Sequence, residues 1–251
     1  RIIMKKILTS LMIVMFLANM GFANNKQNIL MDGSTTVLPI AQATAEEFMN
    51  KNPKVNITVK GGGSGVGIAS LIDKTCDIAN SSIAIKETEI TKAVANGVDP
   101  VAHIVAMDGI AVIVNPSNPL DELSKQTLMN IYTGKITFWS QVPNYKGKGG
   151  AIVVLSRDTA SGTYEAFNTL ALGGRKVRKD ALLNASNRAI LSTVVNTPGA
   201  IGYVGLGYVN NTVKALKIDG IECNAQNVLK GTYALARPLF MYTNGKPKGA
   251  V

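Results

Sequence analysis

The stretch Ala151–Phe167, AIVVLSRDTASGTYEAF, shows most directly how this chain folds. Its first five residues are apolar and rich in β-branched side chains, which predicts a buried strand over Ala151–Leu155. Beyond the turn, Phe167, Leu170 and Ala171 recur at helical spacing, so a helix should follow. A strand that passes through a short turn into a helix is the repeating unit of α/β folds.

The turn between this strand and helix carries one arginine, two hydroxyl side chains and one glycine, namely Arg157, Ser161, Gly162 and Thr163. The first turn of a helix has unpaired backbone N–H groups and a partial positive charge, so it attracts anions. Glycine allows a close approach to the backbone, and hydroxyls add donors. The planar fork of arginine suits two oxygens of a phosphate-like group.

Two other helix starts have the same design. DGSTTVLP places Thr35 and Thr36 before a helix with Pro39 in its first turn, and GGGSGVG places Ser64 before another. Taken singly, each hydroxyl could be an ordinary N-cap, and Arg157 a surface charge. In an α/β sheet, however, such loops gather at the carboxyl ends of the strands, where ligands bind. Together they predict an oxyanion site.

Strand-like and helix-like segments alternate along the rest of the chain. The strand-like ones include VNITVKGGG, CDIANSS, Ile110–Val114 and AIGYVGLGYV; the helix-like ones include KETEITKAVANG and SKQTLMNIYTGK. This alternation predicts an α/β fold with mostly parallel sheets. The length allows one large domain or two lobes.

The N-terminal residues resemble a secretory signal peptide. Lys5 and Lys6 precede an apolar run, and Gly21 and Ala23 have the spacing of a cleavage site. Cleavage would remove residues 1–23 and leave 228 of the 251 residues. We therefore expect export to the periplasm; an uncleaved anchor is the alternative. Arg1 is not a start methionine, so we expect that the sequence is a fragment.

The charge of the chain is positive but scattered. There are 26 Lys and Arg against 16 Asp and Glu, and removal of the signal peptide would lower the net charge from +10 to +7. This balance favours anionic partners. The absence of a basic cluster argues against nucleic acid.

The residues that enzymes and metal sites need are scarce. His103 is the single histidine, and its strand-like surroundings favour a structural role. GGGSGVGIAS lacks the Lys and Ser/Thr of a P-loop, and Val66 breaks the G-x-S-x-G pattern around Ser64. We expect no catalysis, metal or cofactor. Cys76 and Cys223 could form one disulfide or remain two separate thiols.

Six motifs, in this order, resemble the periplasmic phosphate-binding protein of the bacterial phosphate ABC transporter: DGSTTVLP, GGGSGVG, DGIAVIVNPSNP, GKITFW, SRDTASGT and PGAIGYVGLGYV. The resemblance runs from about Ile29 to the end of the chain. It implies two α/β lobes joined by crossing strands that close on dehydrated phosphate. We expect lobe 1 at residues 24–107 plus 205–251, lobe 2 at 108–204, and hinges near Met107–Ala111 and Tyr203–Leu206. It also implies a further terminal helix that this sequence does not contain.

The resemblance also implies the phosphate ligands. They would be Thr36, Val37, Ser64, Arg157, Ser161, Gly162 and Thr163. Some family members have an aspartate that accepts the proton of hydrogen phosphate, where this chain has Ser82. A buried carboxylate accepts that proton and repels sulfate, whereas a serine repels sulfate little. Asp108 could supply the carboxylate, or it could be a turn residue before Gly109.

The implied function is that of a monomeric binding protein that captures inorganic phosphate between its lobes and delivers it to an ABC-type membrane permease. Two alternatives stay open at this point. One is another tetrahedral oxyanion, such as sulfate, molybdate or tungstate. The other is a secreted phosphoryl hydrolase with Ser64 or Ser161 as nucleophile.

Overall fold

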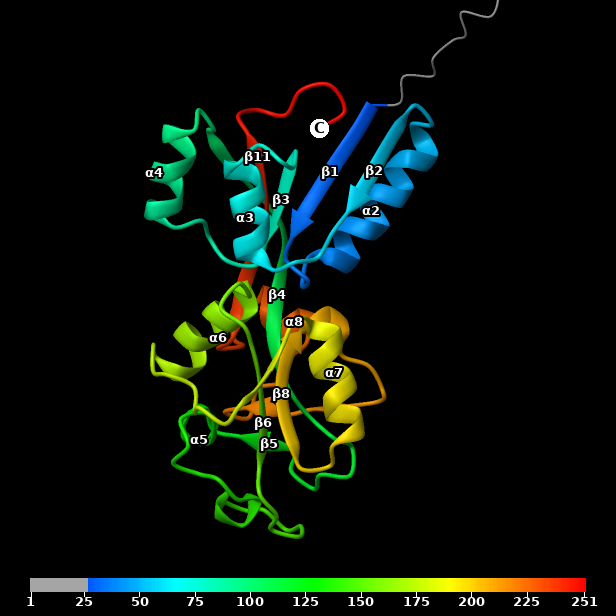
Figure 1. Cartoon of the computed structure of the whole chain (residues 1–251). Helices are drawn as coiled ribbons and strands as arrows, with labels where there is room; N and C mark the ends of the chain where they lie inside the picture. Colours follow the sequence, from blue (N-terminus) through cyan, green and yellow to red (C-terminus); the bar gives the residue numbers. More distant parts are fainter. Residues whose placement is uncertain (1–26) are drawn as a thin grey trace, which may run out of the picture.

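The computed structural model describes residues 27–251, in which two α/β lobes lie end to end (Figure 1). The predicted signal peptide lies outside the described residues. The first lobe opens with β1 (Gln27–Gly33), α2 (Leu38–Lys51), β2 (Val55–Val59), α3 (Ser64–Ile72), β3 (Ile78–Ser81) and α4 (Glu87–Ala95). The predicted strands and helices of this region are confirmed. Pro39 lies in the first turn of α2, where its missing N–H costs no helical hydrogen bond.

The long strand β4 (Pro100–Val114) carries the chain into the second lobe. Its last five residues, Ile110–Val114, are wholly buried, as their β-branched run predicts. Asp108 and Gly109 lie within this strand, so the interpretation of Asp108 as a turn residue was wrong.

The second lobe contains three longer helices and several short elements. They are β5 (Glu122–Leu123), α5 (Lys125–Tyr132), η1 (Trp139–Gln141), β6 (Val153–Arg157), α6 (Gly162–Leu172), β7 (Leu182–Asn184), α7 (Asn187–Asn196), β8 (Ala200–Gly205), η2 (Leu206–Tyr208), β9 (Lys214–Ala215), β10 (Lys217–Ile218) and α8 (Ala225–Leu229). Serine side chains cap α5, α6 and α7, each accepting a backbone N–H of the first turn. The strand β11 (Ala236–Asn244) then returns to the first lobe.

One sheet runs through both lobes in the order β2-β1-β3-β11-β4-β8-β6-β7, with β9 also paired to β4. β1 pairs in parallel with β2 and β3, and β6 pairs in parallel with β7 and β8. Between these parallel groups, β11 and β4 are antiparallel to their neighbours. The carboxyl ends of both parallel groups therefore point toward the junction between the lobes.

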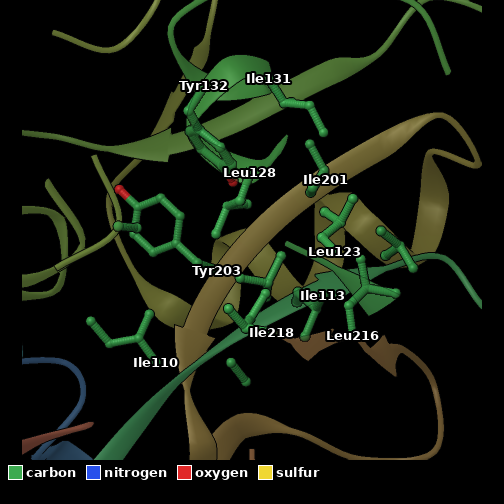
Figure 2. Packing of buried hydrophobic residues seen from close by; sticks show 14 of the residues in the cluster. Ile110, Ile113, Leu123, Leu128, Ile131, Tyr132, Ile201, Tyr203, Leu216 and Ile218 are labelled. Carbon is green, nitrogen blue, oxygen red and sulfur yellow. The ribbon is translucent and has the colours of Figure 1, made fainter. Parts of the chain in front are cut away.

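Each lobe has its own hydrophobic core. The larger cluster lies in the second lobe and joins β4, β6, β8 and their helices. Figure 2 shows part of it, with Ile110 and Ile113 of β4 near Ile201 and Tyr203 of β8. Phe167 stacks on the Tyr203 ring at 4.0 Å between centroids. Two smaller clusters hold the first lobe around β1, β3 and β11.

Residues after β8 still pack in the core of the second lobe. Val213, Cys223, Val228, Tyr233 and Leu235 all belong to the cluster of the second lobe, whereas Leu239 belongs to the first. Strand β8, which contains most of the hinge expected at Tyr203–Leu206, pairs with β4 and β6. We propose that the lobes comprise residues 27–107 with 236–251, and residues 108–235.

Within residues 27–251, no helix has both the length and the apolar character needed to cross a membrane.

Candidate functional site

The starts of three helices meet where the lobes touch. The loops that open α2 and α3 come from the first lobe, and the loop that opens α6 comes from the second (Figure 1). Thr36 Oγ1 lies 2.7 Å from Thr163 Oγ1, and the backbone N–H of Gly65 donates to the carbonyl of Ala160 at 3.0 Å. On the rim, Lys86 pairs with Glu165 at 2.8 Å. The structure thus brings the three predicted segments together.

Glycine is required where the loops approach each other most closely. Gly63, just before α3, has φ +105°, and a Cβ there would lie 2.7 Å from the Ala160 carbonyl oxygen of the other lobe. A Cβ on Gly162 would collide with Ser64 and lie 2.7 Å from Ser82 Oγ. These two glycines let the backbones of the lobes come into contact.

Arg157 closes strand β6 and is almost entirely buried, with 2% of its surface exposed. Its Nε donates to the Asn184 carbonyl and its Nη2 to the Ala185 carbonyl, both at 2.9 Å. Nη1 is buried and has no hydrogen-bond partner among residues 27–251. Burial lowers the pKa of the guanidinium from its ordinary value. The alternative interpretation of Arg157 as a surface charge was wrong.

A core tyrosine fixes the end of strand β6. The Tyr203 hydroxyl lies 2.9 Å from Ser156 Oγ and accepts the Arg157 backbone N–H at 3.2 Å. Burial raises the pKa of Tyr203 to about 12, so its hydroxyl stays protonated. The core of the second lobe therefore sets the position of Arg157.

The serines form a second polar group on the first lobe. Ser64 Oγ accepts the backbone N–H of Ser82 at 3.0 Å, and the two hydroxyl oxygens lie 3.2 Å apart. Both residues are buried. Ser82 thus lies at the interface between the lobes, within the group that the sequence predicted.

Ser161 and Val37 lie at helix starts and differ in their contacts. Ser161 Oγ accepts the N–H of Tyr164 at 3.2 Å, so it is an N-cap in addition to any other role. Val37 is fully buried, and its backbone N–H is 3.4 Å from Ser34 Oγ. Thr36 Oγ1 accepts from Asn187 Nδ2 at 3.0 Å across the lobes.

Asp108 lies at the same interface, but its oxygens are already engaged. Oδ2 accepts from Arg237 Nη2 at 3.0 Å and Nε at 3.2 Å, and Oδ1 accepts the Leu206 N–H at 3.0 Å. Burial raises the pKa of Asp108, and Arg237 opposes that shift. A carboxylate held in this way is poorly placed to accept a proton from a ligand.

Sequence reasoning missed Arg237 and Asn187, which both lie buried at the interface between the lobes. Arg237 was detectable as a single charge within the apolar run LARPLF, where an unpaired arginine would be costly. Asn187 had no such signal, because an asparagine next to a serine at a helix start is common.

Within the part of the chain that the structure describes, the cysteines and the histidine make no hydrogen bond to the proposed phosphate ligands, although Cys223 packs against Gly109, the neighbour of Asp108. Cys76 and Cys223 are free and buried, and they belong to the cores of different lobes. Of the two alternatives, separate thiols is therefore the one observed. His103 Nε2 lies 2.9 Å from Thr243 Oγ1 in the paired strands of the first lobe. Residues 27–251 contain no group of three His, Cys, Asp or Glu side chains that could hold a metal ion.

Known proteins are similar to this chain in sequence and in fold. The family model described as the PBP superfamily domain matches residues 21–250. The phosphate-binding protein PstS of Bacillus subtilis (strain 168) is 34% identical over 226 residues, covering 88% of this chain and 72% of the relative. PstS of Staphylococcus aureus (strain bovine RF122 / ET3-1) is 34% identical, covering 86% and 68%.

Two solved structures are similar to the whole described fold. One, from Clostridium perfringens, is described as a putative phosphate ABC transporter substrate-binding protein with bound phosphate; it is 32% identical, with a TM-score of 0.82 and 89% of each chain covered. An ABC-type phosphate transport receptor from Vibrio cholerae is 31% identical, with a TM-score of 0.68 and 88% of each chain covered. The chain therefore belongs to the phosphate-binding-protein family of the PBP superfamily.

Proposed function

We propose that this protein captures inorganic phosphate between its two lobes and delivers it to an ABC-type membrane permease. The observation that carries this proposal is the buried Nη1 of Arg157, which has no partner among residues 27–251, beside three converging helix starts. An oxyanion there would supply the acceptor that this cationic nitrogen needs. Phosphate is also the ligand bound in the similar Clostridium perfringens structure.

The proposed contacts come from both lobes. Helix N-termini and Nη1 of Arg157 would stabilise the negative charge, and the hydroxyls and backbone N–H groups would replace water. The first lobe would contribute Thr36, the backbone of Val37, Ser64 and Ser82, and the second Arg157, Ser161, Gly162 and Thr163. Because both lobes hold the anion, binding would favour the closed arrangement.

Ser82 takes the place of a carboxylate in this scheme. A hydroxyl can accept the proton of hydrogen phosphate but does not repel sulfate strongly. The oxygens of Asp108 are already bound by Arg237 and by the Leu206 N–H. We propose that the protein prefers phosphate over sulfate by a smaller factor than a site with a free carboxylate would.

We further propose that the protein performs no hydrolysis. Ser64 Oγ contacts the N–H and hydroxyl of Ser82, and Ser161 Oγ contacts the N–H of Tyr164. None of these groups is a base that could take the hydroxyl proton of a nucleophile. We also propose that the protein is exported to the periplasm and is monomeric.

Isothermal titration of the anion-free protein with phosphate and sulfate, at about pH 6 and pH 8, tests the proposal. We expect saturable binding of phosphate to one site and weaker binding of sulfate. Absence of phosphate binding by folded protein would overturn it. Turnover of a phosphate ester that Ser161→Ala abolishes would favour the hydrolase instead.

A further inference from the structure

Arg237 and Asp108 form a buried pair on the two strands that connect the lobes. The residues face each other in the register of β11 and β4, and each has 5% of its surface exposed. The Arg237 guanidinium reaches residues of both lobes, because its Nη1 donates to the carbonyls of Ser82 at 3.2 Å and Gly162 at 3.3 Å. The pair therefore lies at the point where the lobes meet.

All five N–H groups of Arg237 have acceptors within the protein. Nε donates to Asp108 and the two protons of Nη1 go to the two carbonyls. One proton of Nη2 goes to Asp108, and the other is shared between the hydroxyls of Thr163 at 2.9 Å and Thr36 at 3.3 Å. No N–H remains for a ligand. Arg237 therefore acts on an anion through the threonines rather than by touching it.

Asn187 supplies the second constraint on these threonines. Its Oδ1 accepts the backbone N–H of Gly205 at 3.1 Å, which fixes the orientation of the side-chain amide. Its Nδ2 must therefore be the donor toward Thr35 Oγ1 and Thr36 Oγ1, both at 3.0 Å. Thr36 Oγ1 thus accepts from Asn187 and shares one Arg237 proton with Thr163.

Counting lone pairs then gives the direction of the bond between the threonines. A hydroxyl oxygen has two acceptor sites and one proton. Asn187 and the shared Arg237 proton already face the Thr36 oxygen, so a third donor from Thr163 would exceed its acceptor sites. We therefore place the Thr36 proton in the bond to Thr163, at 2.7 Å. Thr163 in turn accepts from Thr36 and Arg237. The Thr163 proton has no acceptor left within this network, so it can be donated to a ligand.

We propose that Arg237, held by Asp108, is a positioning residue that makes the Thr163 hydroxyl a hydrogen-bond donor to the bound anion. This inference rests on the proposed function, because it names how one ligand of that site is set. In this arrangement Asp108 orients Arg237 and balances its charge. Ser82 and Ser64 would then be the groups that accept a proton from the ligand.

The proposal predicts a dependence on the protonation of the ligand. Without Arg237, each threonine regains an acceptor site and can bind a P–OH group. Phosphate carries more protons at about pH 6 than at about pH 8. Loss of Arg237 should therefore weaken binding more at the higher pH, whereas a purely structural defect would weaken it equally at both.

The main variant removes both charges, Arg237→Met with Asp108→Asn, because one charge left alone in the interior would destabilise the fold. The amide introduced by Asp108→Asn keeps an acceptor for the Leu206 N–H. We expect phosphate affinity to fall about ten- to a hundredfold at pH 8, and by a smaller factor at pH 6. Lys214→Met, which breaks the exposed pair with Asp121, is the matched control and should bind like the parent.

Two further measurements separate positioning from structure. Thr163→Val should cost less affinity in the double variant than in the parent, because its donor is no longer directed at the anion. Arg237→Lys keeps the positive charge and Asp108 but loses the planar fork. Its phosphate affinity, and the ratio of its affinities at pH 6 and pH 8, should therefore lie between those of the parent and the double variant. The titratable groups that face the network are Asp108 on β4, Arg157 on β6, Tyr203 and Tyr208 on and after β8, and Cys223 and Tyr233 before β11. Arg237→Lys retains all six.

The inference would be overturned if the folded double variant bound phosphate as tightly as the parent. It would also be overturned if affinity fell equally at both pH values and the effects of Thr163→Val were additive. Failure of the proposed function is distinguishable, since the parent itself would then show no phosphate binding at either pH.

Discussion

At the scale of a single residue, Arg157 has two features suited to binding an anion: a guanidinium held in place and one nitrogen left for the anion. Two of its nitrogens are held by backbone carbonyls, and the third is buried without a partner among the described residues. The guanidinium is therefore oriented before any ligand arrives, which lowers the entropic cost of binding. Its position follows from strand β6 and from Tyr203 in the core.

Replacement of Arg157 by Met should lower phosphate affinity by about a hundredfold, because a buried charge-assisted contact is lost. Calorimetric titration measures the change, and thermal unfolding verifies that the variant folds. Arg188→Met removes the same charge from an exposed position on the neighbouring helix α7. It should change affinity by no more than about threefold, since exposed charges are screened. Equal effects of the two variants would contradict the assignment.

The cysteines give a second prediction at this scale. Burial raises the pKa of Cys76 and of Cys223 to about 12, so about one thiol in ten thousand is thiolate at pH 8. Neither should react with a thiol reagent such as DTNB until the protein unfolds. A reducing agent should leave the melting temperature unchanged, because the two thiols lie in different lobes. A melting temperature that falls on reduction would indicate a disulfide.

At the scale of elements, the predicted strands and helices before residue 206 follow from local patterns. Alternating apolar runs, turn residues and helix caps can be recognised within about ten or fifteen residues of sequence. The three helix starts that form the candidate site were recognised in the same way. The strand β11 was not predicted. Its Arg237 and Pro238 interrupt the apolar pattern, and its position depends on pairing with β4, more than a hundred residues earlier. Arg237 was missed for this reason, whereas Asn187 was missed because an asparagine at a helix start is common.

Helix caps offer a matched pair of substitutions. Ser161→Ala removes the cap of α6, and Ser124→Ala removes the cap of α5, where the serine is exposed. Each should lower the free energy of unfolding by about 1 kcal/mol. Only Ser161→Ala should also weaken phosphate binding, because Ser124 is not among the contacts proposed for the anion. If titration calorimetry shows the same phosphate affinity for both variants, Ser161 is an N-cap only.

Gly162→Ala tests the contact between elements of the two lobes. The added methyl group would collide with Ser64 and Ser82 across the interface, so closure should be blocked while each lobe remains folded. We expect at least a tenfold loss of affinity, roughly the cost of overpacking, and a smaller compaction in solution scattering when phosphate is added. Gly150→Ala, whose Cβ would meet nothing within 4 Å, is the control and should behave like the parent. Compaction of Gly162→Ala equal to that of the parent would contradict this role.

At the scale of the whole molecule, two separately packed lobes share one sheet through β4 and β11 (Figure 1). The carboxyl ends of the parallel strands in both lobes face the junction, so the topology places the helix starts opposite each other. Contacts such as Gly65 to Ala160 and Thr36 to Thr163 exist only when the lobes meet. A ligand that bridges them would shift the molecule toward this arrangement.

The most direct test is a crystal structure of the protein grown with phosphate. The account predicts one phosphate ion between the starts of α2, α3 and α6, with an oxygen within hydrogen-bond distance of Arg157 Nη1 and of the Thr163 hydroxyl. Phosphate bound elsewhere, or closed lobes with Arg157 Nη1 facing no anion at saturating phosphate, would contradict it.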